Sequence, residues 1–121
     1  MTKIYLDANY FLDILEKRQE IELDKLNISD LYISPLTIHV FLYIHKIKIP
    51  NGNIVEVISR FKIVPISADI TDKSLHGPTS DFEDNIQLHC AISGDCDVFL
   101  TRDKKLLALK FYGKLKIAAI L

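Results

Sequence analysis

The sequence predicts an α/β domain in which helices flank a central, mainly parallel sheet of four to five strands. Two observations favour this fold class. Short runs rich in β-branched and aromatic residues alternate with longer segments of helical periodicity, and Pro or Gly marks several of the boundaries between them. The length of 121 residues and the hydrophobic content of 49% suit a single domain over residues 1–121, because such a chain can bury a sizeable core.

The first half of the chain predicts two strands, each followed by a helix. Residues 3–6 form the first strand, and residues 8–17 form a helix with apolar side chains on one face. The second strand covers residues 31–34. Ser34 and Pro35 then begin a helix of about three turns, because Ser caps helices and Pro is tolerated at the first helical position.

The second half continues the alternation. A longer helix is expected to begin after Ser80 and to end near Gly94, since Ser80 and Glu83 have the spacing of a capping box. The other predicted elements are helix 54–60, strand 61–66, helix 68–75, strand 98–100, helix 104–109 and strand 115–118.

Several classes of protein are excluded by the sequence. Charge interrupts the N-terminal residues too early for a signal peptide, and Lys or His interrupts the most apolar stretch, residues 36–49, before it reaches the roughly 20 residues of a membrane span. Cys90 and Cys96 have no partners at metal-site spacing, which predicts buried free thiols. We therefore expect a cytoplasmic protein with no membrane association.

Charge is distributed unevenly. The net charge is only −1, but residues 1–100 carry 9 Lys or Arg against 15 Asp or Glu, whereas residues 101–121 carry 6 against 1. A basic end on an acidic body either binds phosphate or forms a solvated face, and the composition alone leaves both interpretations open.

Acidic side chains fall where strands and helices meet. Asp7 follows the first predicted strand and Asp103 lies just beyond the strand at 98–100, so both emerge at the carboxyl edge of a parallel sheet, where ligands bind. Asp81 and Asp84, three residues apart, are expected on one face of the helix after Ser80. Converging carboxylates favour a divalent cation such as Mg²⁺ or Mn²⁺.

Each acid also has a purely structural interpretation. Asp7 and Asp103 suit the N-caps of the helices that follow them, and acids such as Asp81 and Asp84 are favoured in a first turn by the helix dipole. The structural interpretation explains each residue singly, but it does not explain why three distant segments all supply acids to one edge of the sheet.

Three motifs carry a family resemblance. They are Leu-Asp-Ala-Asn-Tyr-Phe-Leu-Asp (6–13), Ser-Asp-Phe-Glu-Asp-Asn-Ile-Gln (80–87) and Phe-Leu-Thr-Arg-Asp (99–103), supported by Ile-Ser-Pro-Leu-Thr-Ile (33–38). In order and spacing they resemble PIN domains, and the second is similar to that family's Asp-Phe-Glu-Asp-Ala-Ile-Gln variant. The resemblance implies a metal-dependent ribonuclease of the kind that serves as the toxin in VapBC-type toxin–antitoxin pairs.

The resemblance also implies roles for individual residues. Asp7, Asp84 and Asp103 match the catalytic, metal-binding acids, and Asp81 matches an additional metal-binding acid. Asn9 and Thr101 match accessory polar positions beside the metal. Three basic residues next to Asp103 are expected to hold RNA phosphates: Arg102, Lys104 and Lys105.

The implied chemistry is hydrolysis of RNA phosphodiester bonds by a metal-activated water, leaving 5′-phosphate and 3′-hydroxyl ends. The implied partners are an RNA substrate, an antitoxin protein and a second copy of the chain in a homodimer. Apolar side chains in residues 36–49 exceed one helix face, so this segment is expected either to be deeply buried or to contribute to an interface.

One position departs from the family pattern. The helix after the second strand usually supplies a Glu, but the matching residue is Val40, and no carboxylate lies between Leu31 and Pro50. The neighbouring His39 points about 100° away from Val40. The missing acid supports a second hypothesis, a PIN-like RNA- or protein-binding regulatory domain with a degraded, non-catalytic site. The other histidines, His45, His76 and His89, are expected to be structural.

Overall fold

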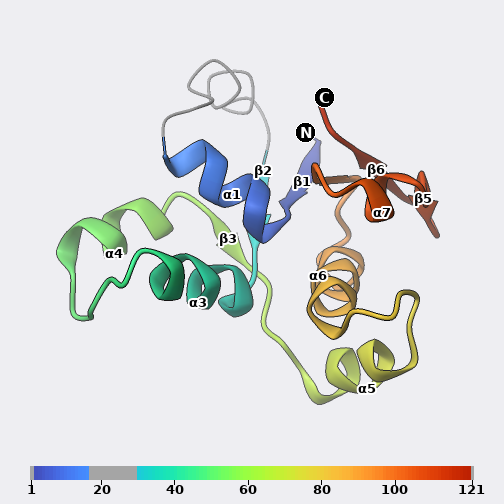
Figure 1. Cartoon of the computed structure of the whole chain (residues 1–121), viewed down its shortest axis with the longest axis horizontal. Coiled ribbons are helices and arrows are strands. Elements are labelled where there is room, and N and C mark those ends of the chain that lie inside the picture. The colour runs from blue at the N-terminus through green and yellow to red at the C-terminus, as the bar shows by residue number, and fades with distance from the viewer. Residues whose placement is uncertain (1, 17–29, 121) are drawn as a thin grey trace.

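The computed structural model describes residues 2–16 and 30–120, which form an α/β domain around one central sheet (Figure 1). Within these residues the strand order is β3-β2-β1-β4-β6-β5, and every neighbouring pair is parallel except β5 and β6. The strands are β1 (Lys3–Leu6), β2 (Asp30–Ile33), β3 (Lys62–Ile63), β4 (Val98–Leu100), β5 (Phe111–Tyr112) and β6 (Leu115–Ala118).

Helices cover both faces of the sheet (Figure 1). The first three pack on one face: α1 (Ala8–Leu15), α3 (Pro35–Ile44) and α4 (Gly52–Ile58). The other three pack on the opposite face: α5 (Ala68–His76), α6 (Phe82–Ser93) and α7 (Lys104–Leu107).

The alternation of side chains along the central strands divides the core in two. In β1, Ile4 and Leu6 face the cluster under α1 and α3, whereas Tyr5 faces the cluster under α6. Phe11 of α1 meets Phe41 of α3 edge to face, with ring centroids 5.7 Å apart. Because β1 is buried on both faces, the loop that follows it is held in a fixed place.

The predicted fold class is confirmed, and most predicted elements are present. The strand expected at residues 61–66 shrinks to β3, and the helix expected at 104–109 ends at Leu107. The expected count of four to five strands was wrong, since the described residues form six. The additional strand, β5, pairs only with β6, and two residues are too few to give a periodic pattern.

Both cysteines are buried and free, as expected. Burial raises the pKa of the Cys90 thiol to about 11 and that of Cys96 to about 12. Cys90 lies in the middle of α6, under the sheet. Neither thiol is therefore poised to react while the domain stays folded.

No helix within residues 2–16 and 30–120 is both long enough and apolar enough to cross a membrane.

Candidate metal centre

Two of the predicted acids emerge side by side from neighbouring strands. Leu6 and Leu100, the last residues of β1 and β4, are paired in parallel register, and the chain continues directly into Asp7 and toward Asp103. The Asp7 amide donates to the Leu100 carbonyl at 3.0 Å, which extends the pairing one residue past the strand. The shared sheet edge predicted for Asp7 and Asp103 is therefore what the structure shows.

Thr101 links these two acids through one hydroxyl group. Its Oγ1 donates to Oδ2 of Asp7 at 2.7 Å and accepts from the Asp103 amide at 3.0 Å. Thr101 is fully buried, and Asp7 is only 3% exposed. The accessory position predicted for Thr101 thus orients both acids, while Asn9 is exposed on α1.

The other two acids lie at the start of α6, and this helix begins one residue later than expected. Ser80 was expected to cap this helix, but Asp81 is the N-cap and its Oδ1 accepts from the Asp84 amide at 3.0 Å. Asp81 therefore precedes the helix, so the expected helix start was wrong, but Asp81 and Asp84 lie close together as expected. Asp103 also caps a helix, since its Oδ1 accepts from the Lys105 amide at 2.8 Å.

Gln87 ties α6 to the beginning of α1. Its Oε1 accepts from the Ala8 amide at 2.8 Å, and its side chain also hydrogen-bonds to the Asp7 carboxylate. Asp7 occupies the N-cap position of α1 but makes no capping bond with its side chain. Gln87 therefore satisfies the first amide of α1 and also contacts the Asp7 carboxylate, so it joins α6 to the site.

Asn85 fixes the loop that leads into α6. It is 2% exposed, its Nδ2 donates to the carbonyls of Ser74 and Thr79, and its Oδ1 accepts from the Thr79 amide and hydroxyl at 2.9 and 2.7 Å. Neither Gln87 nor Asn85 was among the predicted site residues, although both lie in the 80–87 motif that carries the resemblance.

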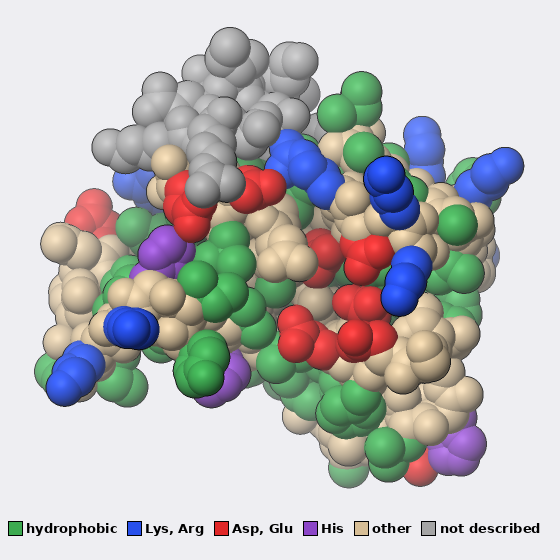
Figure 2. All heavy atoms as spheres, in the orientation of Figure 1, with side chains coloured by type: hydrophobic (Ala, Val, Ile, Leu, Met, Phe, Trp, Pro, Cys, Tyr) green, Lys and Arg blue, Asp and Glu red, His purple; other side chains and the backbone are tan. Residues whose placement is uncertain are grey.

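Electrostatic repulsion is concentrated on Asp84. Partial burial, together with the charges of Asp81, Asp7, Asp103 and Glu83, raises the pKa of Asp84 to about 7. Burial also raises the pKa of Asp7, although hydrogen bonds from Thr101 and Gln87 oppose the rise. In Figure 2 acidic side chains gather near the centre of the view, close to the end of α6. A bound cation would relieve this repulsion.

The donor set fits a hard divalent cation, because carboxylate and hydroxyl oxygens are the ligands that Mg²⁺ and Mn²⁺ prefer. Within residues 2–16 and 30–120, no three Asp, Glu, His or Cys side chains lie close enough to enclose a metal ion. Mg²⁺ is usually held by one or two carboxylates and keeps several of its waters, so an open arrangement of acids suits it.

α3, where the resemblance implies a further acid, carries no carboxylate. Val40 is half-buried and packs against the apolar cluster under α1. Burial and the charges of Asp81 and Asp7 raise the pKa of Glu83, and the exposed His39 opposes this rise. The side of α3 near α6 therefore carries an imidazole that lies close enough to Glu83 to interact electrostatically.

The basic residues expected beside Asp103 differ in their contacts. Arg102 Nη1 donates to Oδ2 of Asp13 at 2.8 Å, and the guanidinium lies over the Tyr10 ring, 4.4 Å from its centroid. Lys104 and Lys105 are exposed at the start of α7. Arg102 therefore fastens the loop after β4 to α1, and the two lysines face solvent.

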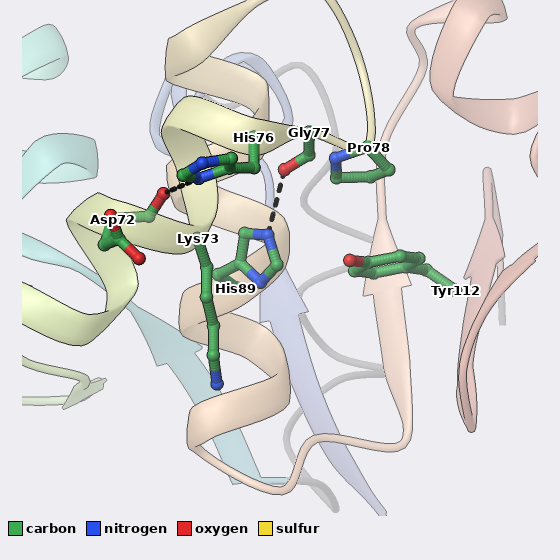
Figure 3. Close-up of a pocket in the computed structure, with 7 residues that line it drawn as sticks. All are labelled: Asp72, Lys73, His76, Gly77, Pro78, His89 and Tyr112. Carbon is green, nitrogen blue, oxygen red and sulfur yellow. Dashed lines mark hydrogen bonds between the residues drawn. The ribbon is translucent and has the colours of Figure 1, made fainter.

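Two histidines line a cavity of about 510 Å³ between α5, α6 and β5, formed without the four acids of the site (Figure 3). His89 Nε2 hydrogen-bonds to the Gly77 carbonyl at 3.0 Å, and the His89 ring meets Tyr112 edge to face. His76 Nδ1 lies 2.9 Å from the Asp72 carbonyl. The contacts of His89 agree with the structural role expected of it.

Comparisons with known proteins identify the fold. The model of the family described as PIN domain matches residues 4–112. The crystal structure of VapBC2 from Rickettsia felis, bound to a DNA fragment from its promoter, has 16% identity and a TM-score of 0.71, covering 97% of this chain and 98% of that one. DNA-bound VapBC from Salmonella typhimurium has 16% identity and a TM-score of 0.68, covering 98% of each chain.

A third similar structure is Mycobacterium tuberculosis VapC20, described as a toxin that cleaves the sarcin–ricin loop. It has 11% identity and a TM-score of 0.64, covering 93% of this chain and 98% of that one. No curated protein sequence matches significantly. At these identities the similarity to solved structures establishes a shared fold.

Proposed function

Because the chain belongs to the PIN domain family, we propose that it is a divalent-metal-dependent endoribonuclease that hydrolyses RNA phosphodiester bonds. The observation that carries the proposal is the meeting of Asp7, Asp84 and Asp103 at one edge of the sheet, with Thr101 bridging the first and the last. The similarity to a toxin that cleaves RNA supports the same reaction class.

In the proposed mechanism Asp7, Asp84 and Asp103 would hold one or two divalent ions, with waters completing the coordination, and Asp81 would lie beside them as an additional acid. Bound Mg²⁺ or Mn²⁺ supplies an activated water and offsets negative charge on the reacting phosphate. Thr101 and Gln87 keep the Asp7 carboxylate oriented, so little reorganisation is needed when substrate arrives. Lys104 and Lys105, exposed beside Asp103, hold neighbouring phosphates without reading sequence, and Arg102 adds positive charge to the same loop.

The proposal is tested by comparing cleavage of a mixed RNA pool by the wild type, Asp7→Asn and Asp84→Asn, with and without Mn²⁺. We expect cation-dependent cleavage that falls at least a hundredfold in either variant. Asp72→Asn is the matched control, because Asp72 is an exposed acid on α5 outside the site. Full activity in Asp7→Asn or Asp84→Asn would contradict the proposed site.

We further propose that the protein acts in the cytoplasm as the toxin of a toxin–antitoxin pair and forms a homodimer. Two of the similar structures are VapBC complexes. The segment predicted to be buried or interfacial is divided: Phe41 is buried, but Tyr43, Ile44 and Ile49 are 76%, 53% and 72% exposed. This apolar end of α3 is the proposed protein contact. Co-purification with the product of a small adjacent gene, followed by mass measurement in solution, tests both partners.

A second function, a non-catalytic PIN-like domain that binds RNA or protein, is favoured by one observation. Val40 packs into the core where the family supplies an acid, so the site has one carboxylate fewer. Calorimetric titration with Mn²⁺ separates the two functions. Binding that disappears in Asp84→Asn favours the nuclease, and no binding by the wild type favours the non-catalytic domain.

A further inference from the structure

A strip of lysines extends away from the acidic site along α7 and the β5–β6 hairpin. Its members are all exposed, and no described acid forms an ion pair with any of them. From residue 101 onward Asp103 is the only acid in the sequence. We call this surface the basic strip: Lys104, Lys105, Lys110, Lys114 and Lys116.

An exposed aromatic ring lies within the basic strip. Phe111 is 60% exposed, and it is the cross-strand partner of Lys116, so the two side chains lie on the same face of the sheet. Tyr112, the next residue, faces the other side, where its ring packs against His89. Phe111 is therefore not a core residue of the hairpin, because it presents its ring to solvent beside Lys116.

The basic strip begins at the acidic site and ends at the sheet edge. Lys104 follows Asp103 directly, and β5 is the last strand of the sheet, three strand spacings or about 14 Å from β1. Figure 2 shows Lys and Arg side chains continuing from the acidic group across the region of α7 and the hairpin. A few nucleotides of an extended strand would cover this distance.

We infer that the basic strip with Phe111 is a binding track for single-stranded RNA that leads away from the acidic site. This inference rests on the proposed function, which supplies the substrate, and extends it by naming the hairpin as a contact. The lysines bind successive phosphates, and the Phe111 ring stacks on an unpaired base. A paired base keeps its faces covered by its neighbours, so the ring favours a single strand over a duplex.

The test measures binding of a fluorescein-labelled oligouridylate, by anisotropy over a series of KCl concentrations, in the Asp84→Asn background. We expect Lys110→Glu/Lys114→Glu to weaken binding at least tenfold and to reduce the slope of log affinity against log salt by about 1.4, since each phosphate contact on a single strand contributes about 0.7. We expect Phe111→Ala to weaken binding about fivefold or more, with no effect on a blunt RNA duplex.

Two exposed lysines in the loop after α3 offer a matched control. Lys46→Glu/Lys48→Glu changes the net charge equally, and Lys46 shares the positive φ of Lys110, 52° against 63°. Leu75→Ala, on α5, removes an exposed apolar side chain as Phe111→Ala does. Neither control is expected to change RNA binding. Equal weakening by the two lysine pairs, or no weakening by the hairpin pair, would overturn the track.

Lysines on an edge strand also discourage pairing with the edge of another molecule. If the lysines served only to prevent such pairing, the hairpin lysine variants would self-associate in light scattering. They would also bind the oligouridylate as tightly as the parent, and this result would overturn the inference. RNA cleavage by Asp84→Asn would instead overturn the proposed function. The comparison of RNA binding between the basic-strip variants and the control variants would still decide the inference.

Discussion

The acidic site and the basic strip lie next to each other but are built differently. Asp7 and Thr101 are almost completely buried, and hydrogen bonds from α6 and from the loop after β4 fix their positions. The lysines of the basic strip are exposed, and no described acid pairs with them. The contrast matches two different requirements, since activating a water needs fixed oxygens, whereas attracting a phosphate chain needs only charge.

This difference predicts how each region responds to substitution. Changes among the buried polar groups should cost stability, because they leave donors or acceptors without partners away from water. Changes in the basic strip should leave stability almost unaffected and should alter RNA binding alone. Four substitutions test the contrast, ordered by the expected change in the free energy of unfolding.

Asn85→Ala should have the largest effect, a loss of about 2–3 kcal/mol in urea unfolding. The substitution removes the amide that joins Ser74 to Thr79 and leaves the buried Ser74 carbonyl without that donor. Asn53→Ala, on the exposed face of α4, is the control and should change stability by less than about 0.5 kcal/mol. Equal effects of the two substitutions would show that the loop before α6 does not depend on Asn85.

Thr101→Val should cost about 2 kcal/mol, because it removes both the donor to Asp7 and the acceptor for the Asp103 amide. Since both acids lose their orientation, RNA cleavage should also fall by about tenfold or more. Thr101→Ser retains the hydroxyl and should keep most of the activity. If the Val and Ser variants cleaved RNA equally well, the hydroxyl bridge would have no part in the reaction.

Asp84→Asn should stabilise the cation-free protein above pH 7 by about 1 kcal/mol, a figure discounted for the partial exposure of the side chain. Folding raises the pKa of Asp84 from 3.8 to about 7, so the folded wild type binds this proton more tightly than the unfolded chain and loses stability as pH rises between these values. The gain should therefore disappear below pH 4. Thermal unfolding across this range measures the gain.

Lys114→Gln/Lys116→Gln should have the smallest effect, a change within about 0.5 kcal/mol in urea unfolding. Both side chains are exposed, and neither forms an ion pair with a described residue. A loss larger than about 1 kcal/mol would mean that the lysines support the hairpin itself, and the contrast between the two regions would then fail.

The placement of Asp7 and Asp103 could be predicted because it follows from local features. Asp7 and Asp103 follow apolar runs that read as strands, and two parallel strands necessarily end at the same edge. The start of α6 was misplaced by one residue because Ser80 and Asp81 are both good N-caps, and the choice depends on contacts of Thr79 that the sequence does not display.

The contact of Gln87 with the site was not predicted, for a related reason. Its partner, Ala8, is 79 positions away, and no local pattern distinguishes a buried Gln that satisfies a distant helix from one on a solvated face. β5 was missed because an edge strand of two residues is specified only by its pairing with β6. What the sequence did not reveal is therefore the set of long-range polar contacts rather than the order of elements.

The burial of Cys90 gives the protein an internal reporter of motion. Its thiol lies in the same helix as Asp84, is shielded from solvent and has a pKa raised to about 11, so alkylation must wait until α6 separates from the sheet. The rate of Cys90 alkylation therefore reports how often α6, the helix that carries Asp84, separates from the sheet. Any ligand that stabilises the packing of this helix against the sheet will lower the alkylation rate, whether or not a reaction follows.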